Sequence, residues 1–370
     1  MMNFITDKDS LHNAINIVQK SVSSKTTMPI LEGILFKIID NTIYLMGTNL
    51  EIGIKTTLSG TIINSGSVVI SARLISEIVR KLSDDDIVVE LKENNILNIK
   101  CGNSDFNIQG QNGEDFPEIP EVITDTEISV PKELFKSMIR ETIFSVAKNE
   151  NIPILTGELI EIKNGTIKFI ALDGYRLAIR QGFIEESSPL HEVIPERTLS
   201  ELYRITSLNS EETIYISYSK NQVLFRLGST YIVSRLLEGE YMDYNKIIPK
   251  SYATKVKVNV DDLLSSCERA SLMVSSGESN LIKLHFFNNT LEISSNSEIG
   301  AVKEQLDLEM DGDPLKIAFN SAYIIDVLKI ISDEEVYLEF TTSVSPCVVR
   351  PVTGNNFTYL ILPVRYLEHE

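Results

Sequence analysis

The stretch LEGILFKIIDNTIYLMGTN, residues 31–49, has two counterparts further along this chain of 370 residues. Its turn, Asn41-Thr42-Ile43, matches Gly165-Thr166-Ile167 and Asn289-Thr290-Leu291 at a constant offset of 124 residues. Each turn follows an alternating apolar run, at residues 31–39, 155–162 and 281–287. This period is too long for a solenoid unit of roughly 20 to 50 residues. The sequence therefore predicts three complete domains of one repeated fold.

The composition is that of a globular protein whose 43% hydrophobic content can supply two or three separate cores. No stretch approaches the ~20 apolar residues of a membrane span, and charged residues interrupt the first 30 residues. We therefore expect a cytoplasmic protein. Cys101, Cys267 and Cys347 fall in different repeats without CxxC spacing, which is typical of reduced, buried thiols.

Two segments rich in glycine, proline and acid, residues 110–120 and 238–249, read as linkers. They predict domains at residues 1–121, 122–250 and 251–370. Each third shows an amphipathic helix, a strand pair, a second helix and further strands, so the expected fold class is α+β, with two helices packed on antiparallel sheet. The helices are expected at residues 8–24, 72–83, 131–149, 196–206, 260–275 and 321–332.

The motifs of several enzyme classes are missing from the sequence. There is no Gly-Lys pair for a Walker A loop, and neither GxSxG nor HExxH occurs. The four histidines, His12, His191, His285 and His369, are scattered. Because the patterned features recur in all three thirds, whereas catalysis needs a unique constellation, we predict no enzyme activity, no catalytic residue, no metal site and no cofactor.

The formal net charge of −18 argues against a nucleic-acid partner when taken alone. Charge acts locally, however, within a Debye length of ~8 Å. The predicted helices at residues 72–83 and 131–149 are net positive, whereas Asp261, Asp262 and Glu268 outweigh Arg269 in the last third. The candidate DNA contacts are Lys20, Lys25, Arg73, Arg80, Lys81, Lys136, Arg140, Lys148, Arg197 and Arg204.

These features, with four motifs, give the chain a resemblance to the bacterial sliding clamp, the beta subunit of the replicative DNA polymerase. The motifs are MPILEG at residues 28–33, DGYRL at 173–177, SRLLEG at 234–239 and YLILPVR at 359–365. The resemblance implies a processivity factor whose chains form a head-to-tail homodimer, a six-domain ring around double-stranded DNA that slides without regard to sequence. It also implies partners that dock short hydrophobic motifs: the replicative polymerase, the clamp loader and repair proteins.

The resemblance further implies a peptide-binding pocket between the middle and last domains. Its lining would comprise Leu155, Leu172, Gly174, Arg176, Leu177, Ile247, Val344, Leu360, Leu362, Pro363, Val364 and Arg365, with Tyr175, Met242, Lys246, Asn320, Tyr323, Pro346 and Tyr366 at its edges. Leu172, Met242 and Pro346 depart from the usual family pattern, so we expect a more apolar pocket. We expect Leu177, Leu360, Leu362 and Pro363 to form its floor, with Arg176 and Arg365 at its rim.

The dimer contact implied by head-to-tail closure would join Ile78, Leu82 and Phe106 of one chain to Leu272 and Met273 of the other. Two alternatives remain at this point. One is an enzyme with a cleft between domains, and the other is a repeat-built peptide-binding scaffold that never encircles DNA.

Overall fold

The structure is a computed structural model that describes residues 2–23, 26–83, 86–123, 126–148, 151–185, 188–274, 280–298 and 300–365. It divides into two compact units, which are considered one at a time. The first comprises Met1–Phe135 and Arg197–Leu236, and the second comprises Lys136–Glu196 and Leu237–Glu370. The middle third of the chain thus contributes to both units.

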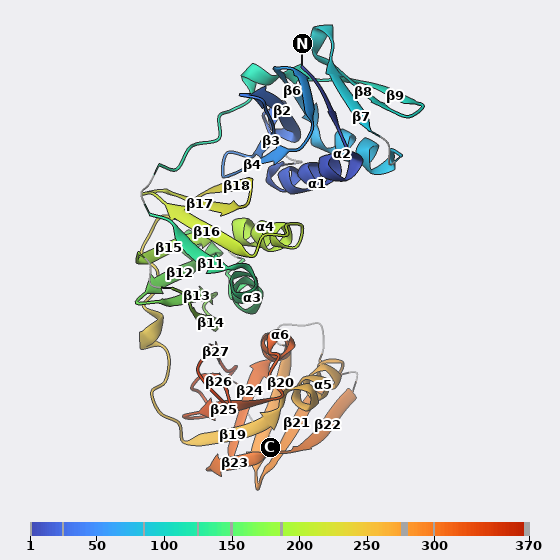
Figure 1. Ribbon diagram of the computed structural model, residues 1–370. Coiled ribbons are helices and arrows are strands. Elements are labelled where there is room, and N and C mark those ends of the chain that lie inside the picture. Colours follow the sequence, from blue (N-terminus) through green and yellow to red (C-terminus); the bar gives the residue numbers. More distant parts are fainter. Residues whose placement is uncertain are drawn as a thin grey trace. The chain divides into compact units, whose positions relative to one another are not determined.

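The first unit contains two sheets (Figure 1). The five-stranded sheet has the order β5 (Thr61–Asn64), β1 (Asn3–Thr6), β7 (Ile87–Leu91), β8 (Ile96–Cys101) and β9 (Ser104–Gln109). The nine-stranded sheet has the order β10 (Gln111–Asn112), β6 (Gly66–Ser71), β2 (Gly33–Ile39), β3 (Thr42–Thr48), β4 (Ile52–Leu58), β18 (Thr230–Arg235), β17 (Gln222–Leu227), β16 (Thr213–Tyr218) and β11 (Ile128–Pro131). Strands from two thirds of the chain therefore share one sheet.

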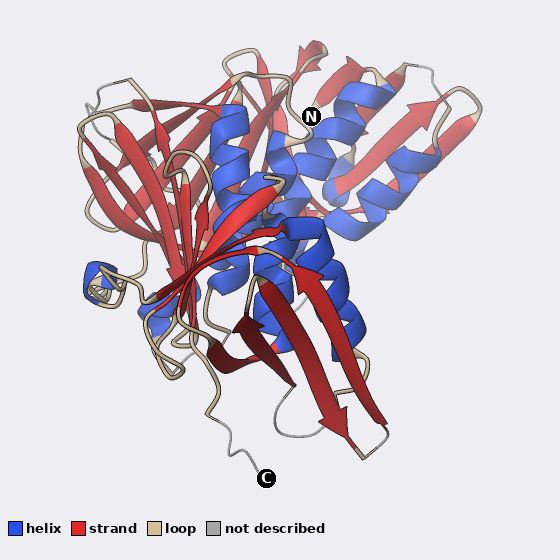
Figure 2. Ribbon diagram, turned by 90° about the horizontal axis from the view of Figure 1, so that it is seen from below, coloured by secondary structure: helices blue, strands red, loops and turns tan. Residues whose placement is uncertain are grey.

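The second unit repeats this plan with one nine-stranded and one four-stranded sheet. The larger sheet has the order β15 (Leu190–Pro195), β12 (Gly157–Lys163), β13 (Thr166–Leu172), β14 (Arg176–Phe183), β27 (Phe357–Ile361), β26 (Cys347–Pro351), β25 (Glu335–Phe340), β19 (Thr254–Asn259) and β23 (Glu309–Gly312). The smaller has the order β22 (Gly300–Asp307), β21 (Thr290–Ser297), β20 (Leu281–Phe287) and β24 (Leu315–Asn320). Strands clearly outnumber helices (Figure 2).

The six predicted helices are confirmed, and several end earlier than expected. They are α1 (Lys8–Val18), α2 (Ala72–Lys81), α3 (Lys132–Thr142), α4 (Glu196–Thr206), α5 (Val260–Ser271) and α6 (Ser321–Ile330). Side-chain oxygens of Asp7, Asn259 and Asn320 cap α1, α5 and α6 by accepting hydrogen bonds from backbone N–H groups in the first turn. Short 3-10 turns, Gln19–Ser21 and Ile143–Ser145, follow α1 and α3.

The repeated turns identified in the sequence are tight hairpins. Asp40 and Asn41, Asn164 and Gly165, and Asn288 and Asn289 all have positive φ between 48° and 71°. Two successive left-handed residues form the turn whose twist matches that of the flanking strands, and Asn, Asp and Gly adopt this conformation most readily. These residue types therefore set the register of β2 with β3, β12 with β13 and β20 with β21.

The strands that precede the first helix of each third were not predicted. They are β1, β11 and β19, and the two shorter ones have only four residues. Every strand pair formed by the described residues is antiparallel. The α+β class with helices and antiparallel sheets is therefore confirmed.

Candidate functional site

The second unit joins the middle and last thirds of the chain where β14 pairs with β27, which we call the second junction. Arg176 lies opposite Ile361 and Leu177 opposite Leu360. The first unit contains an equivalent first junction, where β4 pairs with β18 and Gly53 lies opposite Val233. The predicted pocket residues belong to elements of the second unit, so that unit alone contains the candidate site.

Four predicted pocket leucines form one buried apolar cluster at the second junction. Leu155, Leu172, Leu177 and Leu360 are between 1% and 6% exposed. Tyr241 and Tyr244 of the linker at residues 238–249 belong to the same cluster. The leucines therefore form the base of the site and not its exposed surface.

A small internal cavity lies in a different place, the core of the last third. Leu284, Phe319 and Val349 are among the residues that line it.

Exposed apolar side chains occur among the predicted residues. Tyr175, Met242, Ile247, Val344 and Leu362 are each between 37% and 60% exposed. Monomeric proteins seldom leave large apolar side chains grouped on the surface unless the surface binds something. Of these residues, Tyr175 and Leu362 are joined by a backbone hydrogen bond, so they are the pair that an incoming apolar group could contact first.

Backbone hydrogen bonds fix Leu362 to the middle third and Val364 to the last third. The N–H of Leu362 donates to the carbonyl of Tyr175 at 2.8 Å, and that of Val364 donates to the carbonyl of Ala318 at 2.8 Å. The Tyr175 ring stacks on Tyr323, with centroids 5.9 Å apart and an interplanar angle of 27°. The predicted edge residue Tyr175 therefore lies next to the predicted floor residue Leu362 and stacks on the other edge residue, Tyr323.

The turn that leads into β14 is built by Asp173. Its Oδ1 accepts hydrogen bonds from the N–H groups of Tyr175 and Arg176, at 2.9 and 3.0 Å. Gly174 has φ of +90°, a conformation in which a side chain would be strained. The Asp-Gly pair therefore presents Tyr175 outward and turns Arg176 inward.

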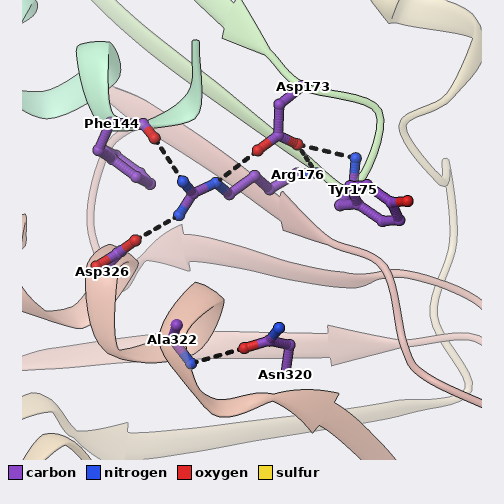
Figure 3. Close-up of polar contacts among 7 residues, drawn as sticks. All are labelled: Phe144, Asp173, Tyr175, Arg176, Asn320, Ala322 and Asp326. Atoms are coloured by element: carbon purple, nitrogen blue, oxygen red, sulfur yellow. Dashed lines mark hydrogen bonds and ion pairs between the residues drawn. The ribbon is translucent and has the colours of Figure 1, made fainter. Parts of the chain in front are cut away.

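Arg176 is buried, with a side chain only 7% exposed, so it does not lie at the rim as expected. Its Nε donates to Asp173 Oδ2 at 3.0 Å, Nη1 donates to Asp326 Oδ2 at 2.6 Å, and Nη2 donates to the Phe144 carbonyl at 2.6 Å (Figure 3). The guanidinium carbon lies 4.8 Å from the Tyr323 ring centroid and 5.2 Å from that of Phe144. We call these five residues the Arg176 cluster.

The structure gives the local contacts and exposure of the other predicted pocket residues. Asn320 caps α6 through its Oδ1, which accepts from the N–H of Ala322 at 3.0 Å (Figure 3). Lys246 is exposed and pairs with Asp243 of its own turn at 3.2 Å. Pro346 immediately precedes Cys347, which lies opposite Ile361. Pro363 is half-buried, Arg365 is exposed, and Tyr366 lies outside the described residues.

Sequence reasoning did not include Phe144, Asp173 or Asp326 in the site. Asp173 lay inside the quoted DGYRL motif, so its position was visible although its role was not. Asp326 is 150 residues from Arg176 along the chain, and an acidic residue on a helix carries no signal for such a partner.

The two junctions share one architecture. Ile30, Leu31, Leu35, Val69 and Phe116 form a buried cluster in the first unit, matching Ile154, Leu155, Leu159, Val193 and Tyr244 in the second. The N–H of Arg235 donates to the carbonyl of Glu51 at 3.0 Å, as the N–H of Leu362 does to the carbonyl of Tyr175.

The apolar content of the junctions differs. At the repeat offset of 124 residues, the first junction has Thr48 and Gly53 where the second has Leu172 and Leu177. A Cβ added at Gly53 would lie 2.8 Å from a side-chain carbon of Ile119, so the linker covers this position. The shared fold therefore does not require the extra leucines of the second junction.

The predicted DNA contacts are mostly exposed. In the first unit, Arg73, Arg80, Lys81, Arg197 and Arg204 are exposed and Lys20 is half-buried; in the second, Arg140 and Lys148 are exposed and Lys136 is half-buried. Lys25 lies outside the described residues. Acidic neighbours offset part of this charge, since Arg73 pairs with Glu77 at 3.2 Å, Arg140 with Glu141 at 3.2 Å and Arg204 with Glu201 at 2.8 Å.

The predicted dimer residues differ in exposure, and only Phe106 lies on an edge strand. Phe106 is 37% exposed on β9, an edge strand of the first unit, and Leu272, which follows α5 in the second unit, is 69% exposed. Ile78 and Met273 are half-buried. Leu82 is only 5% exposed and has almost no surface to offer a partner. A contact through these residues would therefore depend chiefly on Phe106 and Leu272.

Comparison with known proteins places this geometry in a family. Three family models of the DNA polymerase III beta subunit match in order: the N-terminal domain at residues 2–120, the central domain at 129–243 and the C-terminal domain at 245–365. The beta sliding clamp of Staphylococcus epidermidis is 37% identical and that of Staphylococcus aureus 36%, over 99% of this chain and 100% of each relative.

Solved structures agree. A putative DNA polymerase III beta subunit from Eubacterium rectale and a DNA polymerase sliding clamp from Bacillus subtilis both match with a TM-score of 0.95, at 37% and 33% identity, over 99% of this chain and 100% of each of theirs. The fold is thus three clamp domains in tandem. The chain belongs to the family of DNA polymerase III beta subunits, the beta sliding clamps.

Proteins of this family are processivity factors and not enzymes, which removes the enzyme alternative. None of the helices in the described ranges is long and apolar enough to cross a membrane.

Proposed function

We propose that two copies of this chain close head to tail into a six-domain ring that encircles duplex DNA and tethers the replicative polymerase. The ring is a cytoplasmic processivity factor, made of domains at residues 1–121, 122–250 and 251–370. Polymerase, clamp loader and repair proteins dock short apolar motifs at the second junction. Family membership supports the ring, and the leucines added at the second junction support the docking site.

The comparison of junctions carries the docking proposal. At both junctions, strands from two thirds of the chain pair in one sheet over a similar small buried cluster. The fold alone therefore explains why Leu31 and Leu155 are apolar. Leu172 and Leu177 are additional and buried, and the exposed Tyr175 and Leu362 adjoin the ends of β14 and β27. Capturing two apolar side chains at ~1.5 to 3 kcal/mol each supplies roughly 3 to 6 kcal/mol before the cost of ordering a peptide is subtracted, so these contacts alone give binding weaker than micromolar. Such binding allows partners to exchange.

The DNA contacts in this proposal are made to phosphates by the exposed lysines and arginines, and they carry no sequence information. These contacts are weak, because Glu77, Glu141 and Glu201 offset part of the positive charge. The ring therefore stays on DNA because it encircles the duplex and not because it binds the duplex tightly. The subunit contact in this proposal joins Phe106, on the edge strand β9 of one chain, to Leu272, at the end of α5 of the other.

A primer-extension assay tests this function. With the replicative polymerase, the clamp loader and a long primed template, addition of this chain should lengthen the products made in one binding event. Products of unchanged length in the presence of loader and ATP would contradict the proposal. The matched control omits the loader, because a closed ring should then have no effect.

A further inference from the structure

We infer that Arg176 is a positioning residue of the peptide site: by holding Tyr323 and the end of α3, it fixes the Tyr175–Tyr323 pair against which a partner's apolar motif docks. The inference rests on the proposed docking function. It concerns a residue that does not itself face the partner, since its side chain is 7% exposed.

The contacts of Arg176 come from three parts of the chain. Asp173 belongs to the turn before β14, the carbonyl of Phe144 to the 3-10 turn after α3, and Asp326 to α6. A planar guanidinium can donate to three acceptors in one plane while stacking against aromatic faces, whereas an ammonium group cannot reproduce that geometry. Arg176 therefore fixes the turn and α6 relative to each other at the second junction.

The same guanidinium supports the tyrosine pair. Its carbon lies 4.8 Å from the centroid of Tyr323, and the Tyr323 ring in turn stacks on Tyr175. Tyr175 is 60% exposed, and an isolated exposed ring would be free to change rotamer. Holding it in one position before binding removes part of the ordering cost, which is about 0.5–1.5 kcal/mol for each side chain immobilised at an interface.

The first junction shows that the fold does not need this arginine. At the repeat offset, the residue equivalent to Arg176 is Ile52, which is 1% exposed. A buried arginine with acidic partners is often no more stabilising than a well-packed apolar residue. An isoleucine at position 176 should therefore allow the junction to form while removing the support for Tyr323.

The experiment compares Arg176→Ile, Arg176→Lys and Asp326→Asn with the wild-type full-length chain. The probe is a fluorescent synthetic peptide that copies the apolar docking motif of the replicative polymerase from the same genome, followed by anisotropy at 25 °C. Arg226→Lys is the matched control, because Arg226 also pairs with a carboxylate, Glu127, and stacks on an aromatic ring, Tyr215, in the first unit.

We expect Arg176→Ile to bind the peptide about tenfold more weakly and Arg176→Lys to show a smaller loss, in line with the cost of ordering two tyrosines during binding. Asp326→Asn should weaken binding in the wild type but have little effect in the Arg176→Ile background. The control should bind as the wild type does. Unchanged affinity of both Arg176 variants would overturn the inference.

A spectroscopic readout separates positioning from general destabilisation. With 3-fluorotyrosine incorporated at all 13 tyrosines, the Tyr323 signal is assigned by its loss in Tyr323→Phe. In peptide-free protein this signal should move or broaden in Arg176→Ile and remain in place in Arg226→Lys. An unmoved signal would overturn the inference even if affinity fell. A wild-type chain that does not bind the peptide would overturn the docking function and this inference with it.

Discussion

Replacing Glu158 by Gln should make the protein more stable at alkaline pH and leave it almost unchanged at pH 5. Glu158 lies on β12, is fully buried, and is the one acidic residue at a position that holds Ile34 and Ile282 in the other two repeats. Its Oε2 lies 2.8 Å from the Thr142 hydroxyl, whereas Oε1 has no hydrogen-bond partner among the residues that the structure describes.

Hydrogen bonding indicates which form of Glu158 is present. The Thr142 hydroxyl also lies 2.7 Å from the carbonyl of Met138, which can only accept. The hydroxyl of Thr142 has one proton, which it donates to the Met138 carbonyl. The hydrogen bond between Thr142 and Glu158 then needs a proton on Glu158, so a neutral Glu158 donates to the Thr142 oxygen. Burial, with a smaller effect of the charge of Glu196, raises the pKa of Glu158 from 4.5 to about 8.

The sign of the pH dependence follows from proton uptake. Between pH 4.5 and about 8 the folded chain holds a proton on Glu158 that the unfolded chain has lost. Stability therefore falls as pH rises through this window and becomes constant above it. At about 1.4 kcal/mol per pKa unit the full loss is at most roughly 5 kcal/mol, because the folded chain can relax around an ionised carboxylate. Gln mimics the neutral acid and does not titrate.

The assay is thermal unfolding followed by circular dichroism between pH 5 and 9. The melting temperature of Glu158→Gln minus that of the wild type should be near zero at pH 5 and exceed about 5 °C at pH 9, since 1 kcal/mol corresponds to about 2–4 °C in a unit of this size. The exposed Glu133→Gln on α3 is the control and should show no such trend. A difference that does not vary with pH would refute the reasoning.

Three further changes test the proposed surfaces. Ending the chain after Ile361 removes the hydrogen bonds from Leu362 to Tyr175 and from Val364 to Ala318. We expect the dimer to persist while calorimetry shows a loss of peptide affinity of more than tenfold, about 1.4 kcal/mol. Unchanged affinity would show that partners dock at another surface. Replacing Leu272 and Met273 by Ala should give a folded monomer by light scattering that still binds peptide, and an unchanged dimer mass would count against the interface. Neutralising Arg73 and Arg140 together should weaken loading onto DNA and flatten its salt dependence without creating a sequence preference, whereas an unaltered salt slope would make them ordinary surface charge.

The repeated fold was predictable because its signals are local. The hairpin turns need residues that tolerate positive φ, and Asn41, Gly165 and Asn289 satisfy that need within two residues of the strands they connect. Helix periodicity likewise predicted all six helices. The end of α3 was not predictable, because Thr142 contacts Glu158, sixteen residues away, and apolar periodicity alone suggested that the helix continued.

The candidate site was predictable as a set of positions but not as a geometry. The resemblance to the clamp family placed Tyr175, Arg176 and Tyr323 in the predicted pocket. It did not show that Arg176 is buried against the ring of Tyr323. That arrangement depends on the Phe144 carbonyl, from the turn after α3, and on Asp326 of α6, which belongs to the last third and reaches Arg176 across the second junction. The burial of Leu82 was missed for a similar reason, since its place after α2 gave no sign of the surrounding core.

Topological retention on DNA tests the central claim most directly. The chain is loaded by the clamp loader onto nicked circular DNA, separated from free protein by gel filtration in high salt, and the DNA is then cut once with a restriction enzyme. If two chains form a closed ring, protein should co-elute with the circle as a dimer of twice 41.5 kDa and be lost after linearisation. Protein that stays on the linear DNA, or that never remains on the circle, would contradict the account.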